Sequence, residues 1–293
     1  MSPTQARTFH AVAKAGSLTA AAKALRVSQP TVTTQIRELE LSYGVELFHR
    51  HARGVTLTHT GQELLTIVRR IHANQQDAVE FLRSAQGLQT GHLRIGAYGS
   101  YPAIKILAEF NRRYSKLDVS LHFANSLALE EELLNHELDV VVITHSRSTH
   151  EFYSLPYRRI VGQVAIIGKN HPWSRRKSVS VKELAGQPFV VREAGASSRQ
   201  ATDEVIAQSG GVAGKTIEVN SREGVFAAVA EGLGISTIFN EGIVPSDKVI
   251  KLPINGVEIV SEVDVVCLRH RKDSRIITAF FSIAEELRTS DQA

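Results

Sequence analysis

Apolar side chains recur at steps of three and four through the first 45 residues, and this spacing predicts three short amphipathic helices. We place them at residues 4–15, at residues 18–25 and from the cap Ser28 to about Tyr43. The inward-facing stripes are Ala6, Phe9, Val12 and Ala13, then Leu18, Ala21, Ala22 and Leu25, then Val32, Ile36 and Leu39. Because only two residues link the second helix to the cap of the third, the pattern predicts a helix-turn-helix.

Helix ends and a wing are marked by short polar residues and glycine. Gly16 and Gly44 are typical of the residue after a helix, and Ser17 is typical of the residue before one. Pro30 falls in the first turn of the third helix, where a missing N–H costs little. The alternation VTLT beyond Gly44 predicts a two-stranded wing with Arg53-Gly54 at its tip.

A longer helix is predicted after the wing. Thr60-Gly-Gln-Glu63 matches a capping box, and the helix extends to about Gln86, with a hinge at residues 89–91. Its apolar seam consists of Leu64, Val68, Ile71, Gln75, Ala78, Leu82 and Ala85. These alternating steps of four and three are typical of a coiled coil, so we expect dimerisation there; the alternative is a helix packed on its own chain.

From His92 onward, apolar strands alternate with helices, which predicts parallel sheets covered on both faces. The expected organisation is an all-α winged helix-turn-helix domain at 1–59, a linker and dimerisation helix at 60–87, and an α/β domain at 91–293. The last domain is expected to have a first lobe at about 91–160 and 268–293 and a second lobe at about 161–267.

The charge distribution adds to this picture. The 293 residues are 43% hydrophobic and 22% charged, which is sufficient for conventional cores. Residues 1–60 hold seven Lys or Arg and three Glu, whereas the rest of the chain holds 27 basic and 27 acidic residues. All of the net charge of +4 therefore lies in the helix-turn-helix segment, as expected for a segment that binds a polyanion.

The third helix is the predicted DNA-reading element. Its face opposite Val32, Ile36 and Leu39 is polar, and small hydroxyls and a glutamine at a helix N-terminus can approach base edges in the major groove. Arginines on this helix and on the wing can neutralise phosphates. The predicted DNA-binding residues are Ser28, Gln29, Pro30, Thr31, Thr33, Thr34, Arg37, Arg50 and Arg53.

The stretch FHAVAKAGSLTAAAKALRVSQPTVTTQIRELELSYGVELFHR resembles the N-terminal signature of LysR-type transcriptional regulators. The resemblance extends along the whole chain. It implies a winged helix-turn-helix, a linker-helix dimer and a two-lobed effector domain shaped like a periplasmic binding protein. It also implies a homodimer or homotetramer on an interrupted palindromic operator in double-stranded DNA, with RNA polymerase as a further candidate partner.

Polar residues follow four strands of the predicted two-lobed domain, where ligands bind between strand ends and helix N-termini. Serine hydroxyls, backbone N–H groups, helix dipoles and arginines together favour a small anion. The alternative for each serine is a plain helix cap. The predicted effector-binding residues are Tyr98, Gly99, Ser100, Tyr101, Asn125, Ser126, Arg192, Glu193, Ser197, Ser198, Ser221 and Arg222, and Arg199 is a further source of positive charge.

A narrower resemblance concerns the effector. The stretches QTGHLRIGAYGSYP, VREAGASSRQATDE and EVNSREGVFAAVAEGLG are similar to the regulators associated with 2-aminoethylphosphonate catabolism. This implies a small phosphonate with an ammonium group, which Glu193, Tyr98 or Tyr101 would face. An amino acid or another carboxylate is the alternative.

Other protein classes explain less of the chain. The sequence has no G-x-S-x-G, Walker loop, G-x-G-x-x-G after a strand or C-x-x-C, so we expect neither an enzyme nor a cofactor. The pairs His49/His51 and His145/His150 lack supporting cysteines or acids, so we expect no metal site. A transport binding protein would leave the helix-turn-helix unexplained, and an architectural DNA protein would leave the C-terminal two-thirds unexplained.

Cellular location is also an expectation from sequence. The lone cysteine, Cys267, lies in the apolar run VDVVCL and is expected to be buried and inert. We find no secretory signal and no stretch of the ~18–20 apolar residues that cross a bilayer. We therefore expect a protein of the reducing cytoplasm without contact to a membrane.

Overall fold

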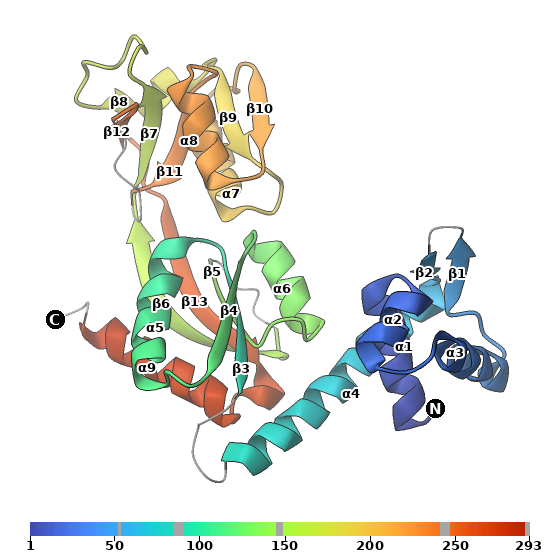
Figure 1. The fold of residues 1–293 in the computed structure, drawn as a ribbon. Coiled ribbons are helices and arrows are strands. Elements are labelled where there is room, and N and C mark those ends of the chain that lie inside the picture. The colour runs from blue at the N-terminus through green and yellow to red at the C-terminus, as the bar shows by residue number, and fades with distance from the viewer. Residues whose placement is uncertain (52–53, 85–90, 145–148, 241–246, 291–293) are drawn as a thin grey trace. The chain divides into compact units, whose positions relative to one another are not determined.

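The computed structural model describes residues 1–51, 54–84, 91–144, 149–240 and 247–290 (Figure 1). The chain divides into two compact units, which are Met1–Ala85 with Asn135–Glu137, and Gln86–Leu134 with Leu138–Ala293. The predicted wing-tip residue Arg53, the last seam residue Ala85 and the hinge residues Gln89 and Thr90 lie outside the described residues.

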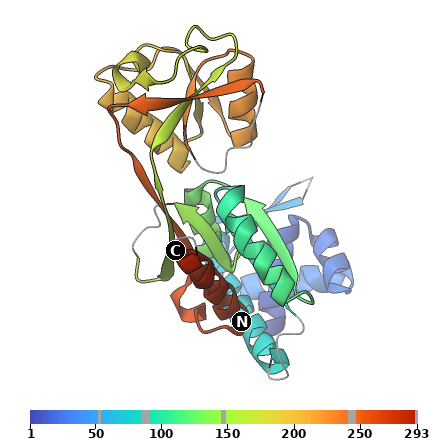
Figure 2. The same ribbon diagram turned by 90° about the vertical axis from the view of Figure 1, so that its left-hand side faces the viewer.

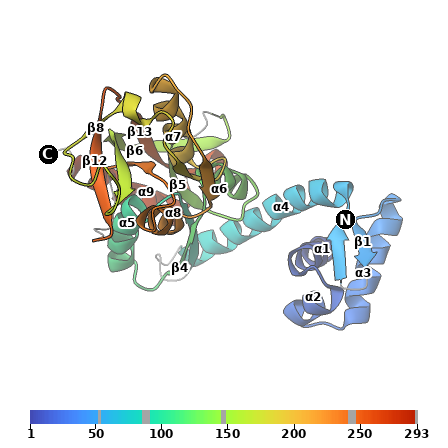
Figure 3. The same ribbon diagram turned by 90° about the horizontal axis from the view of Figure 1, so that it is seen from above.

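The first unit contains the predicted helices and wing (Figure 3). Its elements are α1 (Pro3–Ala15), α2 (Leu18–Leu25), α3 (Gln29–Tyr43), β1 (Phe48–His51), β2 (Gly54–Leu57) and α4 (His59–Ser84). Phe9, Val32 and Ile36 lie in one buried core with Leu47 and Val68. The three-and-four spacing therefore identified the inward faces of α1 to α3, because a helix can bury only one such stripe.

Glycine is required where the wing meets the turn between α1 and α2. Gly16 ends α1 with φ +60°, a left-handed conformation that disfavours other residues. A Cβ on Gly54 would lie 2.4 Å from the Gly16 carbonyl oxygen. This close approach lets the Val55 N–H donate to that oxygen at 2.9 Å, which fixes the wing on the helix-turn-helix.

The start of α4 differs from the prediction. The helix begins at His59, and its first turn is capped by Thr58, whose Oγ1 accepts from the Gly61 N–H at 3.0 Å and donates to the Glu46 carbonyl at 2.7 Å. The Thr60–Glu63 pair is therefore not the capping box. Thr58 and Thr60 carry the same side chain, so the sequence offers two possible caps. Thr58 is the one that also donates a hydrogen bond to the Glu46 carbonyl, on the other side of the wing.

The seam of α4 has two environments within this unit. Leu64 and Val68 pack on the helix-turn-helix core, where Val68 is 1% exposed. Beyond them Ile71 is 47% and Leu82 71% exposed. Among the residues that the structure describes, none of the helices combines the length and the apolar character needed to span a bilayer.

In the second unit, the first lobe is built on a five-stranded sheet in the order β4-β3-β5-β13-β6. Helices α5 and α9 lie side by side on one face (Figure 2), where Phe110 and Phe280 are 5.6 Å apart between ring centroids. Helix α6 packs on the other face through Leu129 and Leu133. The elements are β3 (His92–Ala97), α5 (Ser100–Arg113), β4 (Asp118–Phe123), α6 (Ser126–Leu134), β5 (Val140–Thr144), β6 (Phe152–Val161), β13 (Val260–Leu268), η2 (Arg269–Arg271) and α9 (Arg275–Ser290).

The second lobe has a four-stranded sheet in the order β11-β7-β12-β8 and a parallel pair of β9 and β10. Alternate residues of β7 face opposite ways: Ala165 belongs to the buried cluster that includes Val205 of α7, and Ile166 belongs to the cluster that includes Val229 of α8. The elements are β7 (Gln163–Gly168), β8 (Val179–Ser180), η1 (Val181–Leu184), β9 (Phe189–Arg192), α7 (Ser197–Gln208), β10 (Thr216–Val219), α8 (Arg222–Ala230), β11 (Ser236–Phe239) and β12 (Val249–Asn255).

The sheets correct two expectations. They are mixed rather than parallel, because β13 runs antiparallel to β5 and β6, and β7 antiparallel to β11 and β12. Strand β13 also pairs within the first lobe, although the expected second lobe reached residue 267. An apolar run in the sequence indicates burial on both faces but carries no information on strand direction or partner.

Candidate functional site

The exposed face of α3 begins at a capped N-terminus. The Ser28 Oγ accepts from the Thr31 N–H at 3.2 Å, and the Thr33 hydroxyl donates to the Gln29 carbonyl at 3.0 Å. Thr34 and Arg37 are exposed on the same side, as are Gln29, Pro30 and Thr31, while Thr33 is half-buried. The buried stripe lies opposite, so this face has the polarity and the side-chain sizes of a major-groove reader.

The wing contributes one described arginine. Arg50 lies on β1, its side chain is 52% exposed, and its Nη2 is 4.0 Å from a carboxylate oxygen of Glu40. The other oxygen of Glu40 accepts from the Leu47 N–H at 2.9 Å, which joins α3 to the wing. Arg50 therefore extends from a strand that is held against α3, and its exposed guanidinium can contact a DNA phosphate.

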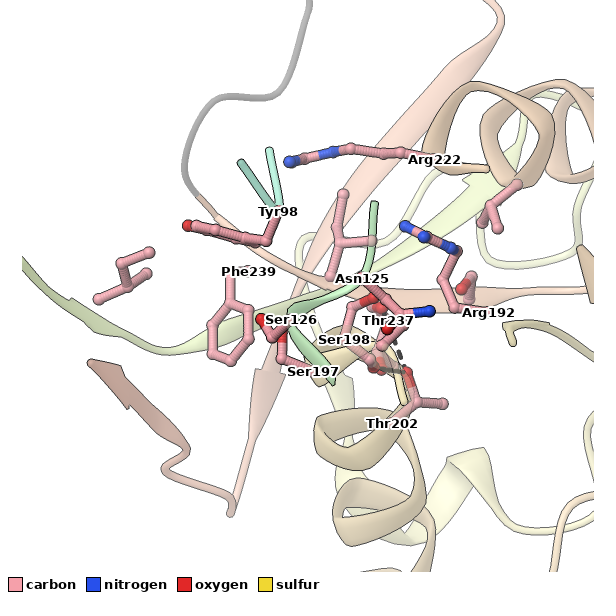
Figure 4. A pocket seen from close by; sticks show the side chains of 15 residues that line it. Tyr98, Asn125, Ser126, Arg192, Ser197, Ser198, Thr202, Arg222, Thr237 and Phe239 are labelled. Atoms are coloured by element: carbon pink, nitrogen blue, oxygen red, sulfur yellow. Dashed lines mark hydrogen bonds between the residues drawn. The ribbon is translucent and has the colours of Figure 1, made fainter. Parts of the chain in front are cut away.

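A cavity of about 60 Å³ lies between the walls of the two lobes (Figure 4). Because about 15 Å³ is enough for one water molecule, a cavity of this volume suits a small ligand rather than a large one. Residues at the starts of α6, α7 and α8 and along β11 line it, and no Asp or Glu is among these described residues. The lining is Tyr98, Asn125, Ser126, Ile160, Arg192, Ala196, Ser197, Ser198, Thr202, Arg222, Val225, Ser236, Thr237, Ile238 and Phe239.

The N-terminus of α7 is the part of the lining with unused donors. Its cap residue is Ala196, which has no side-chain acceptor for the first turn. Ser197 and Ser198 make no hydrogen bond through N–H or hydroxyl to another described residue. Since the first N–H groups of a helix lack internal acceptors and carry partial positive charge, this end of α7 is suited to an anion.

The other two helix starts at the cavity are capped by their own chain. The Asn125 Oδ1 accepts from the Ala128 N–H at 2.9 Å at the start of α6. The Ser221 Oγ accepts from the Gly224 N–H at 3.1 Å at the start of α8, and Ser221 does not line the cavity. Ser221 thus caps α8 and lies outside the cavity lining.

Two arginines bring positive charge to the cavity. Arg192 donates from Nε and Nη2 to the Glu193 carboxylate at 2.7 and 2.9 Å. Burial raises the pKa of Glu193, but these hydrogen bonds and the charge of Arg192 outweigh it, so the pKa is lowered overall. Arg222 begins α8, with its Nη1 3.7 Å from where a Cβ on Gly99 would lie. Burial lowers its pKa from a very high value, so it remains a cation.

The back of the cavity is formed by residues that sequence reasoning missed. The Thr202 hydroxyl is 2.8 Å from the Thr237 hydroxyl and donates to the Ser198 carbonyl at 2.8 Å. Thr202 lies one helical turn beyond Ser198, so its place on the same face of α7 was readable from the sequence. Thr237 and its neighbours on β11 had no such signal, because the pairing of β11 with β7 brings them there.

Of the twelve predicted effector residues, the structure brings seven to the cavity: Tyr98, Asn125, Ser126, Arg192, Ser197, Ser198 and Arg222. Gly99, Tyr101, Glu193 and Ser221 are outside its lining. Tyr101 is 48% exposed, with the Arg158 guanidinium 5.5 Å from its ring centroid. The Ser126 hydroxyl is 3.1 Å from that of Thr144, so it also serves the fold. The side chain of Ser100 is outside the described part of the structure.

No group of three or more metal-ligating side chains occurs among the described residues. The ring centroids of His49 and His51 are 6.4 Å apart on the wing, and the His51 Nε2 is 2.9 Å from the Thr56 hydroxyl. His145 lies outside the described residues.

Family models match both the helix-turn-helix unit and the two-lobed domain of this chain. Residues 3–62 match the model for bacterial regulatory helix-turn-helix proteins of the lysR family, and residues 86–288 match the LysR substrate binding domain. The chain is 30% identical over 241 residues to the HTH-type transcriptional activator CmpR of Synechocystis, covering 80% of this chain and 77% of CmpR.

Two solved structures share the fold. A full-length OxyR variant from Pseudomonas aeruginosa aligns with a TM-score of 0.76 at 21% identity, over 98% of this chain and 95% of that one. The regulatory domain of Synechocystis CcmR, solved in complex with 2-PG, aligns with a TM-score of 0.60 at 22% identity, over 68% of this chain and 97% of that one. The helix-turn-helix, the two-lobed domain and the two family matches together show that this chain belongs to the LysR family of DNA-binding transcriptional regulators with an effector-binding domain.

Proposed function

We propose that this regulator is controlled by a small anion bound between the two lobes. The observation that carries the proposal is the uncapped start of α7, where Ser197 and Ser198 present unused donors to a cavity that is also lined by Arg192 and Arg222. An anion there gains hydrogen bonds from a helix N-terminus and two positive charges, and no lining carboxylate among the described residues opposes it.

Within this class, 2-aminoethylphosphonate is the first candidate, as its subgroup resemblance implied. Its phosphonate has three oxygens to accept from the α7 donors and the arginines. Its ammonium would meet the Tyr98 hydroxyl or the threonines at the back of the cavity rather than Glu193, whose two oxygens already accept from Arg192. An amino acid or another carboxylate is the second candidate, and the complex of the CcmR domain with 2-PG supports a small ligand in this fold.

The effector class is tested by calorimetric titration of the full chain with 2-aminoethylphosphonate, ethylphosphonate, inorganic phosphate, 2-PG and β-alanine. Binding of at least one phosphorus oxyanion is expected. The substitution Ser198→Ala together with Arg222→Met should weaken it by more than ten-fold, because hydrogen bonds to a charged group contribute about 1.5–3 kcal/mol each. The matched control is Ser180→Ala, which removes a serine cap at η1 outside the cavity lining and should leave affinity unchanged. Binding of β-alanine alone would reassign the effector to the carboxylates.

Control of DNA binding follows from linkage between the two units. An effector that binds one arrangement of the lobes more tightly shifts the protein towards it, and with it the spacing or bend of the DNA-reading heads. We propose that two chains, or four, assemble through the exposed part of the α4 seam around Ile71 and Leu82 and bind an interrupted palindrome. RNA polymerase remains a candidate partner. Equal footprint length and DNA bending with and without saturating effector would contradict this mechanism.

The DNA-reading face of α3 is tested with two neighbouring substitutions. Thr34→Ala should change base preference, because the exposed hydroxyl faces base edges. Arg37→Ala should weaken binding to all sequences and reduce the salt slope by about one, as loss of a phosphate contact does. Equal losses on specific and random DNA for Thr34→Ala would remove it from the readers.

A further inference from the structure

Glu193 lies behind the cavity wall and joins residues that line the cavity from both lobes. Its Oε2 accepts from the Arg192 Nε at 2.7 Å, and its Oε1 accepts from the Arg192 Nη2 at 2.9 Å. The same Oε1 accepts from the Asn125 Nδ2 at 3.3 Å. Arg192 ends β9 in the second lobe and Asn125 precedes α6 in the first, so one carboxylate links the two walls (Figure 4 shows both partners).

Both partners of Glu193 are themselves fixed. The Asn125 Oδ1 accepts from the Ala128 N–H at 2.9 Å, which ties its amide to the first turn of α6. The Arg192 carbonyl accepts from the Arg199 Nη1 at 3.0 Å, which ties the end of β9 to α7. The Glu193 side chain is 19% exposed and that of Arg192 is 17% exposed. The carboxylate therefore lies at a sheltered junction of three elements rather than on a free surface.

Close packing accompanies the link. Gly195 has φ +88°, and a Cβ there would lie 3.3 Å from the Asn125 Oδ1 and 3.4 Å from the Leu127 Cβ. The Gly195 backbone therefore packs directly on the side chains of Asn125 and Leu127 at the start of α6. This close packing lies beside the hydrogen bond between Asn125 and Glu193.

We propose that Glu193 is a positioning residue of the effector site, which aims Arg192 into the cavity and holds the two walls together through Asn125. The part that concerns ligand binding rests on the proposed function above. By occupying the Nε and Nη2 edge of the guanidinium, Glu193 leaves Nη1 of Arg192 for an anion. This role replaces the sequence-based expectation that Glu193 receives an ammonium group.

A role in charge alone predicts the opposite result for one substitution. If Glu193 only reduced the positive potential of the cavity, Glu193→Gln would raise the affinity for an anion. If it positions Arg192 and Asn125, the same change lowers the affinity, because an amide oxygen accepts fewer of their hydrogen bonds and its NH2 group faces other donors. The sign of the effect therefore separates the two roles.

The first test is a double-mutant cycle on the full chain, with inorganic phosphate as the titrant in calorimetry. Glu193→Gln should weaken phosphate binding about ten-fold. Asn125→Asp keeps an acceptor for the Ala128 N–H but places a carboxylate against Glu193, so it should also weaken binding. The double variant restores the hydrogen bond between residues 125 and 193 with donor and acceptor exchanged but keeps a carboxylate in the cavity lining, so it should bind phosphate more tightly than Asn125→Asp alone. Tighter binding by Glu193→Gln, or additive effects in the cycle, would overturn the proposal.

The second test needs no ligand. Spin labels at Glu131→Cys on α6 and Ala207→Cys on α7 report the separation of the lobes by pulsed EPR, and the native Cys267 is 0% exposed and does not compete for label. Glu193→Gln should broaden the distance distribution and the double variant should narrow it again. An unchanged distribution in Glu193→Gln overturns the link between the walls. If the wild type bound no anion, the proposed effector class would fail while this measurement still decided the link.

Discussion

Asp139 is a buried carboxylate held by two arginines, so removing its charge tests how much this ion-pair cluster stabilises the fold. Its carboxylate lies at the start of β5, 4% exposed, and accepts from the Arg94 N–H at 2.8 Å, from the Arg94 guanidinium at 2.7 and 3.0 Å, and from the Arg271 Nη1 at 2.5 Å. Arg271 is also 4% exposed, whereas Arg94 is 30% exposed. Asp139→Asn keeps the shape of the side chain but removes the charge that these arginines surround.

The expected cost follows from this burial. Breaking a buried ion pair by removing one partner costs about 3–5 kcal/mol of unfolding free energy. Because Arg94 is partly exposed, we expect Asp139→Asn to cost about 3 kcal/mol, the lower end of this range. For a protein of this size, that lowers the melting temperature by roughly 6–12 °C. Thermal unfolding of the full chain followed by circular dichroism measures the shift. The matched control is Asp118→Asn, an exposed residue at the start of β4, which should stay within about 0.5 kcal/mol of wild type.

The pH dependence gives the result an internal check. Burial raises the pKa of Asp139, but the hydrogen bond from Arg94 and the charge of Arg271 outweigh it and lower the pKa overall. The stabilisation is therefore complete above the unfolded-state pKa of about 3.9 and is lost as the pH falls through the lower folded-state pKa. The difference between wild type and variant should be constant from pH 7 to 5. A variant melting within 2 °C of wild type, or a difference that already halves by about pH 5.5, would refute this account.

Three further predictions concern the first unit. Thr58→Ala should cost about 1 kcal/mol of stability through loss of the α4 cap, whereas Glu63→Gln should cost almost nothing; equal costs would contradict the assignment of the cap. Burial and the nearby His72 lower the pKa of His10 from 6.5 to about 4, so wild type should lose stability relative to His10→Gln as the pH falls from 6.5 to 4, measured by melting temperature against pH. Leu82→Glu should shift the assembly towards monomer in sedimentation, because a charge is unfavourable in an apolar seam; an unchanged mass would exclude this part of α4 from the interface.

Local patterns predicted the first unit well because its helices are specified by neighbours in sequence. The stripe Val32, Ile36 and Leu39 is buried, and Ser28 caps α3. The mixed sheets were not predictable in the same way. Strand β13 pairs with β5 and β6 across about a hundred residues or more, and its apolar sequence is compatible with either direction.

The cavity between the two lobes shows where a local pattern stops being informative. Ser198 and Ser221 both follow a strand and stand near the start of a helix. Ser221 is the cap of α8, so its hydroxyl is used, while Ser198 is the second residue of α7, so its hydroxyl lines the cavity. A shift of one or two residues in the helix start changes the role of the serine, and sequence patterns do not define helix ends that closely.

The two strands that cross between the lobes make the second lobe an insertion in the first. Val161 at the end of β6 pairs with Val260 at the start of β13, and the Gly162 N–H donates to the Ile259 carbonyl at 2.9 Å. The chain thus leaves and re-enters one antiparallel ladder at adjacent positions, which a two-residue turn would also close. The residues between these two positions form a unit that could be replaced as a whole. A second lobe from a relative, joined at Gly162 and Ile259, would change half of the cavity lining while the ladder, the linker helix and the DNA-reading unit keep their sequence.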